Sequence, residues 1–389
     1  RAATGIRALM RTPRSIEAHE RILLGDSAIA EKLGEALAID AFDDRLTHLF
    51  HTYPAGLNPD AARMLVQLFD GDSVYDPFCG GGTVLVEGRV AGRRTVGTDL
   101  SQTAIRTALA RTSTASEDVL TRMRSRARKL TEAARSATEE PPEHIVEPLR
   151  QWYAPYVLLE LECIRKGIVE SDDDIRPLLE ACFSSLLVKT SWRKSDTSAQ
   201  RVKHNRPKGT AAILFHKKAR ELGRRIAALR DEVPEGTPDS VIALRDAREP
   251  YLGAPVDLVL TSPPYPGTYD YVPLQHLRRV WFEERDHAGQ GELGSRRSWR
   301  EKSRAARRSW VEGTDLWTQA AARGLKPGGV LCVVIGDGIP PAGVIDTSGV
   351  TDTAARKAGL VTLARASVER VDHARNTSRW EHVLAFRKE

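Results

Sequence analysis

The chain has 389 residues, 41% hydrophobic and 28% charged, which excludes a fibrous or intrinsically disordered protein and allows a large hydrophobic core. Lysine and arginine outnumber aspartate and glutamate by 58 to 52, and the net charge of +6 is only weak evidence for a polyanionic partner. The four cysteines form no C-x-x-C pair, so we expect neither a zinc site nor a disulfide framework, as in a cytoplasmic protein. No apolar run approaches the roughly 18 residues that span a bilayer, so we expect no membrane anchor.

The first half of the chain predicts a helical arm followed by a βαβ unit. Residues 1–50 are polar with partial helical periodicity, including Ile22-Leu23-Leu24, and we interpret them as a packing arm. A buried strand at 73–75, a glycine-rich loop, a helix at 84–91 and a second strand at 94–99 follow. This crossover connection requires a parallel sheet.

The second half predicts a helical insertion and the return of the sheet. Residues 105–239 are helical in pattern and rich in Arg, Glu and Ala. Short apolar runs at 241–244 and 256–260 predict buried parallel strands. A helix from about Asp315 ends near Pro327, a strand follows at 330–335, and 360–368 with 382–386 predict an antiparallel pair. We therefore expect an α/β fold, a Rossmann-like seven-stranded sheet with a helical insertion after its second strand, divided as 1–50, 51–104, 105–239 and 240–389.

Two motifs lie at the ends of predicted strands. Asp76-Pro77-Phe78-Cys79-Gly80-Gly81-Gly82-Thr83 follows the first strand, and Thr261-Ser262-Pro263-Pro264-Tyr265 follows the strand at 256–260. A glycine-rich loop at the carboxyl edge of a parallel sheet lets a ligand approach the backbone closely. The loop lacks a Gly-Lys-Ser/Thr ending, which disfavours a triphosphate. Asp99 ends the next strand, where a carboxylate can accept both ribose hydroxyls, and this leaves NAD open as a rival ligand.

Together the motifs resemble the cofactor and catalytic loops of the S-adenosylmethionine-dependent amino-methyltransferases, which methylate an exocyclic NH2 of a nucleobase. The resemblance implies a seven-stranded methyltransferase sheet, S-adenosylmethionine as cofactor and no metal. It places Asp76 at the methionine end of the cofactor, Asp246 near the adenine amine, and the segment at 51–55 over the methionine moiety. The expected cofactor-binding residues are Tyr53, Asp76, Phe78, Gly80, Gly82, Thr83, Asp99 and Asp246.

The second motif suits methylation of an amine. The lone pair of an exocyclic base amine is delocalised into the ring, so an enzyme must localise it. The Ser262 hydroxyl and the Pro263 carbonyl can accept the two amine hydrogens, and the prolines at 263 and 264 stiffen the loop that holds these acceptors. Tyr265 offers an aromatic face on which an extruded base can stack. The predicted catalytic residues are Ser262, Pro263, Pro264 and Tyr265.

The first residue of the tetrapeptide bears on the product. In the family, Ser is associated mainly with N4 of cytosine, and Asp or Asn mainly with N6 of adenine or N2 of guanine, so Ser262 predicts N4-methylcytosine in DNA. The glycine loop precedes the catalytic loop here, an order that also resembles the tRNA guanine-N2 methyltransferases. An RNA base methyltransferase and a DNA adenine-N6 methyltransferase therefore remain alternatives, and a nucleic-acid-binding protein with an inactive methyltransferase fold is the non-enzyme alternative. A partner nuclease, as in restriction-modification, and the oligomeric state are left open.

Two basic runs are candidates for contact with nucleic acid. The first lies within 189–208 beside Trp192, and the second follows the catalytic loop near Trp299 and Trp310. Lysine and arginine in such runs can neutralise phosphates and position a duplex, although each run also fits a solvated surface. The residues expected to contact nucleic acid are Arg193, Lys194, Arg201, Lys203, Arg296, Arg297 and Arg300.

Overall fold

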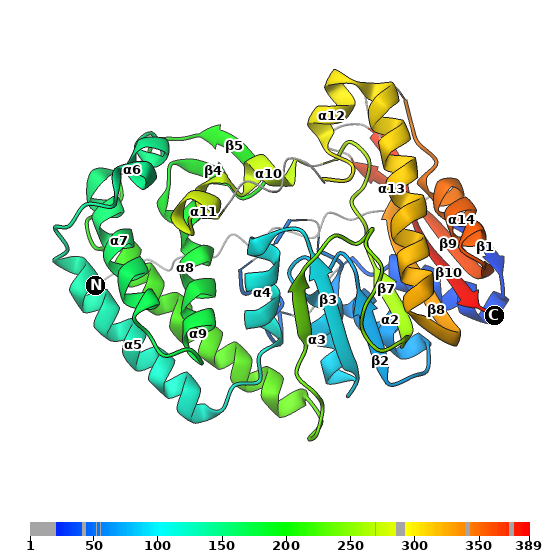
Figure 1. The fold of residues 1–389 in the computed structure, drawn as a ribbon, viewed down its shortest axis with the longest axis horizontal. Coiled ribbons are helices and arrows are strands. Elements are labelled where there is room, and N and C mark those ends of the chain that lie inside the picture. Colours follow the sequence, from blue (N-terminus) through cyan, green and yellow to red (C-terminus); the bar gives the residue numbers. More distant parts are fainter. Residues whose placement is uncertain are drawn as a thin grey trace, which may run out of the picture.

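A mixed eight-stranded sheet forms the centre of the part of the chain that the structure describes. The computed structural model describes residues 21–40, 44–51, 53–54, 56–268, 270–284, 292–338, 343–372 and 377–389. Within these ranges the strand order is β1-β9-β10-β8-β7-β2-β3-β6 (Figure 1). The strands are β1 (Arg21–Gly25), β2 (Ser73–Asp76), β3 (Arg94–Asp99), β6 (Val241–Leu244), β7 (Val256–Thr261), β8 (Leu325–Gly336), β9 (Leu360–Asp372) and β10 (Thr377–Lys388).

The direction of the strands matches the predicted Rossmann-like pattern. Strands β6, β3, β2, β7 and β8 are parallel, and β10 pairs antiparallel with both β8 and β9. Chain order reverses beside β2, because β3 lies on one side of it and β7 on the other, which opens a crevice at the carboxyl ends of these strands. The predicted fold class is confirmed, with one strand more than the expected seven.

Alternating side chains on the strands build two separate cores. On β8, Val330, Cys332 and Val334 pack with the core beneath α1 (Ser27–Leu37) and α2 (Pro59–Leu68). The intervening Leu331, Val333 and Ile335 pack with the core beneath α13 (Ser303–Gly324) and α14 (Thr347–Lys357). This period of two explains why the strand reads as a continuous apolar run, since both of its faces are buried.

The additional strand corrects the prediction of a helical arm. Residues 21–25 pair antiparallel with β9, with Arg21 opposite Val368 and Gly25 opposite Ala364. A short apolar run is compatible with either a helix or a strand, and here the unpaired edge of β9 decides in favour of the strand. The helical prediction holds from Ser27, where the Asp26 carboxylate caps α1 by accepting from the Ile29 N–H at 3.0 Å. Residues 1–20 lie outside the described part.

The helical insertion has a core of its own. After β3, the helix α4 (Gln102–Thr112) packs beside α3 (Thr83–Val90) and completes the βα unit. The helices that follow are α5 (Glu117–Arg135), α6 (Glu143–Leu149), α7 (Pro155–Val169), α8 (Arg176–Thr190) and α9 (Thr210–Glu232). They lie beside the sheet domain (Figure 1) and bury one large apolar cluster, to which Leu277 and Trp281 also contribute. The predicted domain boundaries stay a prediction.

A hairpin and three later helices complete the described structure. The insertion contains a two-stranded hairpin, β4 (Arg193–Ser195) and β5 (Ser198–Arg201), where the sequence predicts only helix. After the catalytic loop come α10 (Tyr271–Leu274), α11 (His276–Trp281) and α12 (Arg296–Glu301). Helix α13 begins at Ser303, earlier than the predicted Asp315, so the second basic run is helical.

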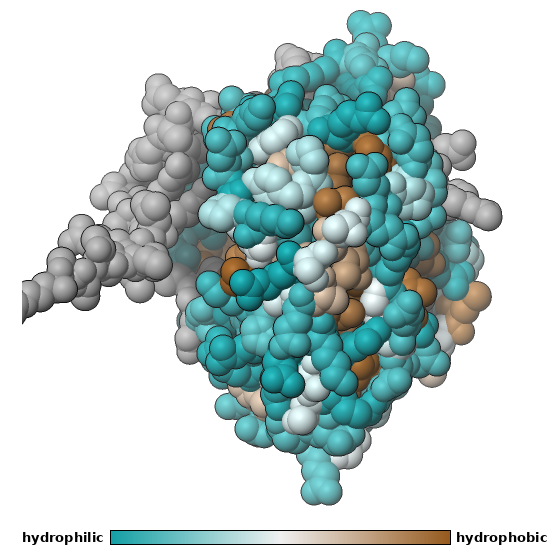
Figure 2. All heavy atoms as spheres, turned by 90° about the vertical axis from the view of Figure 1, so that its left-hand side faces the viewer, coloured by the Kyte–Doolittle hydropathy of each residue, from teal (hydrophilic) through white to brown (hydrophobic). Residues whose placement is uncertain are grey.

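The surface of the insertion end is mainly hydrophilic, with only small hydrophobic areas between polar side chains (Figure 2). Every helix among the described residues is too short or too polar to cross a membrane.

Candidate active site

The glycine loop connects β2 to α3 in a conformation that requires glycine. Gly80 has φ 48° and Gly82, which precedes the first residue of α3, has φ 80°. A Cβ on Gly82 would lie 3.1 Å from the Ala108 Cβ, so the positive backbone angle strains any larger residue and the packing against α4 leaves a Cβ little room. The Cys79 N–H donates to the Thr98 carbonyl at 2.9 Å, which fixes the loop to the end of β3. The fold therefore presents bare backbone at the crevice.

Asp99 lies beside this loop and keeps capacity to bind a ligand. Its Oδ2 accepts from the Gly80 N–H at 3.0 Å and its Oδ1 from the Ser101 N–H at 2.8 Å. Each carboxylate oxygen can accept a further hydrogen bond. Burial raises the pKa of Asp99 to about 6. This geometry suits a pair of ribose hydroxyls.

Asp76 joins the two motifs. Its Oδ1 accepts from the Phe78 N–H at 3.1 Å and from the Thr261 hydroxyl at 2.6 Å, which leaves Oδ2 with acceptor capacity for a ligand. Burial raises the pKa of this carboxyl to about 7. Thr261, the residue directly before the catalytic tetrapeptide, thus orients the acid of the glycine loop, a role that was not predicted from the sequence.

One cavity of about 530 Å³ unites most of the predicted site. It runs from the glycine loop past the ends of β3, β6 and β7 to α11. The predicted residues that line it are Tyr53, Asp76, Phe78, Gly80, Thr83, Asp99, Asp246, Ser262 and Pro264. Gly82, Pro263 and Tyr265 do not line it. Among the described residues, no group of three or more His, Cys, Asp or Glu side chains is arranged to hold a metal ion.

Asp246 has a partner that the sequence motifs do not indicate. Arg248 holds its carboxylate through two guanidinium nitrogens, with Nε to Oδ1 at 2.9 Å. Burial alone would raise the pKa of Asp246, but the hydrogen bonds from Arg248 outweigh it and lower the pKa. Arg248 also lines the cavity, so the pair presents both acceptor and donor groups at the predicted adenine end.

A second, smaller cavity adjoins the large one at the loop of the second motif and at Gly56 and Leu57, which line both. Ser262 lines both cavities, whereas Tyr265 lines only the second, which measures about 130 Å³. The Tyr265 ring packs against the backbone of Gly336 at the end of β8, and its side chain hydrogen-bonds Ser262. The Pro264 carbonyl accepts from the Trp310 indole at 3.3 Å. Ser262 therefore stands in the wall between a large and a small cavity.

The first basic run is divided between surface and interior. Lys194, Arg201 and Lys203 are exposed, and the cations of the last two lie 5.1 and 5.2 Å from the Trp192 ring. Arg193 is only 5% exposed, and its guanidinium donates to the carbonyls of Ser198 and Leu274. The phosphate contact predicted for Arg193 is corrected, because this side chain ties the hairpin to α10 instead.

The second basic run begins on α12, beyond the cavity residues Glu292 and Leu293, and continues onto α13. Its three predicted arginines, Arg296, Arg297 and Arg300, are exposed, and Arg297 forms an ion pair with Glu301 at 2.9 Å. The neighbouring Trp299 and Trp310 are buried in the core beneath α13 and cannot stack on a base.

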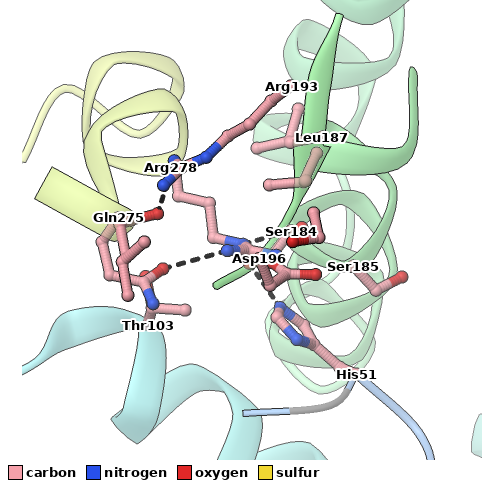
Figure 3. A network of polar contacts seen from close by, with 12 residues as sticks. His51, Thr103, Ser184, Ser185, Leu187, Arg193, Asp196, Gln275 and Arg278 are labelled. Atoms are coloured by element: carbon pink, nitrogen blue, oxygen red, sulfur yellow. Dashed lines mark hydrogen bonds and ion pairs between the residues drawn. The ribbon is translucent and has the colours of Figure 1, made fainter. Parts of the chain in front are cut away.

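A buried polar network connects the insertion with the cavity (Figure 3). Arg278 on α11 is 2% exposed and donates to the Ser184 carbonyl at 3.1 Å, to the Gln275 side chain at 3.0 Å and to Asp196 of the hairpin at 2.5 Å. The Ser184 hydroxyl is 2.7 Å from His51 Nε2. Gln275 lines the large cavity, so the network fixes the hairpin relative to the site. No sequence signal indicated this arrangement.

Comparisons with known proteins place these features in a class. The family model described as RMKL-like, methyltransferase domain matches residues 49–146. The Type II methyltransferase M.MvaI of Kocuria varians is 25% identical over 265 residues, which cover 61% of this chain and 58% of that protein. The tRNA (guanine(10)-N2)-dimethyltransferase of Methanothermobacter thermautotrophicus is 43% identical over 51 residues, 12% of this chain and 15% of that protein. The crystal structure of TrmN from Thermus thermophilus is similar with a TM-score of 0.36 and 12% identity, covering 86% of this chain and 50% of that chain.

The matched residues 49–146 contain the glycine loop and Asp99, and the strand order around β2 agrees with the predicted Rossmann-like sheet. The residues that form the cofactor crevice are thus similar to a methyltransferase domain, and the expected cofactor, S-adenosylmethionine, agrees with this similarity. The chain spans less than two thirds of the length of either curated relative.

Proposed function

We propose that this protein transfers a methyl group from S-adenosylmethionine to the exocyclic amine of a flipped DNA base, with N4 of cytosine as the acceptor. The observation that carries the proposal is the position of Ser262 between the two cavities. A cofactor in the large cavity and a base in the small one would meet at this residue.

The residues of the large cavity fit the cofactor. Asp99 retains acceptor capacity for the ribose hydroxyls, Asp76 can offer its Oδ2 to the ammonium group, and the glycine loop lets the ligand approach the backbone. When bound, S-adenosylmethionine supplies an electrophilic methyl group. Tyr53 covers the loop, since a Cβ on Gly80 would lie 3.3 Å from its ring.

The residues of the small cavity fit a flipped base. Ser262 would accept one hydrogen of the amine and help to localise its lone pair toward the large cavity, whereas Pro263, the second acceptor predicted from the sequence, lines neither cavity. Tyr265 would contact the face of the base, because its side chain lines the same cavity. The amine needs no covalent activation, so the loop has only to hold and orient it.

Two observations bear on the substrate. Ser262 favours N4 of cytosine through the family resemblance, and the 265-residue similarity to a Type II methyltransferase favours DNA. The 51-residue similarity to a tRNA (guanine(10)-N2)-dimethyltransferase favours the second candidate, methylation of N2 of guanine in RNA. The exposed side chains of Lys194, Arg201 and Lys203 suit the phosphate backbone of either polymer.

Mass spectrometry of nucleosides from treated DNA and treated tRNA tests the proposal. We expect N4-methylcytosine in the DNA, and none after the Ser262→Ala change, while calorimetry with S-adenosylhomocysteine shows that the variant still binds the cofactor product. N2-methylguanosine in tRNA beside unmodified DNA would establish the second candidate instead. Unmodified nucleic acid of both kinds, with intact cofactor binding, would refute base methylation.

A further inference from the structure

Arg111, near the end of α4, is a buried cation directly beneath the glycine loop. It is 4% exposed, and its Nη2 donates to His48 Nδ1 at 3.2 Å and lies 3.4 Å from the Thr83 hydroxyl. Within the described part of the chain its Nε has no hydrogen-bond partner, and no carboxylate there forms an ion pair with it. A guanidinium in such a position normally has an acidic partner.

The acid that His48 contacts already has partners of its own. Glu87 receives the His48 Nε2 hydrogen bond at 2.6 Å and the Arg63 guanidinium at 3.0 Å. His48 accepts from Arg111 at Nδ1 and donates from Nε2, which is the pattern of a neutral imidazole. Burial lowers the pKa of His48, in agreement with this state. Among the described residues, the positive charge of Arg111 is therefore uncompensated, and burial lowers its pKa to about 9.

The guanidinium lies directly behind two residues that line the cofactor cavity, although Arg111 itself is not among the lining residues. A Cβ built on Gly81 would be 2.4 Å from Arg111 Nη1, and both Gly81 and Thr83 line the large cavity. Helix α3 begins at Thr83, and Gly82 provides no side-chain cap for the N–H groups of its first turn. Free N–H groups and the positive end of the helix dipole thus lie beside an unpaired cation.

We propose that Arg111 and the first turn of α3 form the binding site for the carboxylate of the methionine portion of the cofactor. The inference rests on the cofactor of the proposed function and not on its acceptor base. Asp76 lies at the preceding end of the same loop, so the loop offers an acceptor for the ammonium group and donors for the carboxylate of one amino acid. The buried charge of Arg111 is then neutralised by the ligand.

Decarboxylated S-adenosylmethionine, which lacks only this carboxylate, tests the proposal by calorimetry. Charge-assisted hydrogen bonds to a buried cation correspond to about a 10- to 100-fold preference of the wild-type protein for the complete cofactor. In Arg111→Gln we expect the affinity for S-adenosylmethionine to fall by that factor and the affinity for the decarboxylated compound to stay the same. Arg111→Lys should restore part of the preference.

Arg89 provides a matched control. It is a buried arginine on α3 that donates to the Thr112 carbonyl and the Thr114 hydroxyl, away from the loop. Arg89→Gln should keep the preference for the complete cofactor, whatever its effect on thermal unfolding. Equal affinity of the wild type for the two compounds, or an undiminished preference in Arg111→Gln, would overturn the proposal. Equal affinities of the wild type would overturn the proposal even if Arg111→Gln did not fold, and Arg111→Lys then tests the assignment to this side chain. An intact preference in a protein that methylates no base would refute only the proposed function.

Discussion

Replacement of Asp76 by Asn should make the protein more stable and weaken its binding of the cofactor. Both hydrogen bonds to this carboxylate, from the Phe78 N–H and the Thr261 hydroxyl, are accepted by Oδ1. An asparagine can accept both at the same atom and needs no change in the surrounding loop. The substitution therefore removes a buried charge without removing its hydrogen bonds.

The raised pKa sets the magnitude and the sign of the effect. Burial raises the pKa of Asp76 from 3.8 to about 7, so the folded protein binds this proton more tightly than the unfolded chain does. The free energy of unfolding consequently falls as the pH rises from about 4 to about 7, by on the order of 4 kcal/mol, and stays low above that range. An asparagine at this position has no carboxyl group to ionise, so the variant does not lose stability in this way. The difference in free energy of unfolding between Asp76→Asn and the wild type should therefore grow by about 3 kcal/mol between pH 5 and pH 8.

Urea unfolding at these two pH values measures the difference. Asp99→Asn is the matched control, because each carboxylate oxygen of Asp99 accepts a backbone N–H. The NH2 group of an asparagine would face one of these N–H donors, so this variant should gain less stability than Asp76→Asn. Calorimetry with S-adenosylmethionine should show at least a tenfold loss of affinity in Asp76→Asn, since the ammonium group loses its counter-charge. An equal change in stability at pH 5 and pH 8 would refute the assignment of a raised pKa to Asp76.

Three further outcomes follow from the site and its surroundings. Asp99→Ala should weaken cofactor binding about a hundredfold, on the order of 3 kcal/mol, because two charge-assisted hydrogen bonds to the ribose are lost; unchanged affinity in calorimetry would remove Asp99 from the site. Replacing the exposed cations of the hairpin with Glu should lower the affinity for DNA of every sequence alike. The slope of log affinity against log salt concentration should fall by about 0.9 for each phosphate that is no longer neutralised. Salt titrations identical to those of the wild type would contradict this role. These cations are Lys194, Arg201 and Lys203. Arg278→Met should lower the free energy of unfolding, measured in urea, by about 3–5 kcal/mol, because the Asp196 carboxylate loses its buried partner. A change below about 1 kcal/mol would show that solvent replaces the ion pair.

The sequence predicts the cofactor crevice well because local backbone chemistry determines it. Glycines at 80 and 82 adopt positive φ angles, and the acid at the end of β3 lies one strand away from the loop it contacts. Short apolar runs identified all seven strands of the Rossmann-like pattern. These features depend on residues that are adjacent in sequence or on neighbouring parallel strands, so their spacing alone brings them together.

Other features depend on contacts between distant segments, which no local pattern records. The network around Arg278 joins α11 to Ser184 and Asp196, about 80 to 95 positions earlier in the chain. Strand β1 pairs with β9 across more than 300 positions, and its apolar residues alone are equally compatible with a helix. Arg111 carries no motif, and its role emerges only from the absence of an acidic partner among the described residues.

The two motifs and the basic runs differ in how much a residue's type constrains its position. A glycine at positive φ or a proline in a stiff loop acts through its own backbone, so its identity already implies its local structure. An arginine acts through a long side chain that can reach solvent or the interior. Arg193 and Lys194 are adjacent in the same hairpin, yet the first is buried against Leu274 and the second is exposed. Alternation of side chains on a strand separates them, and this separation requires knowing that the segment is a strand. Charge density therefore locates a candidate surface for a polyanion, while the structure decides which of its cations are exposed.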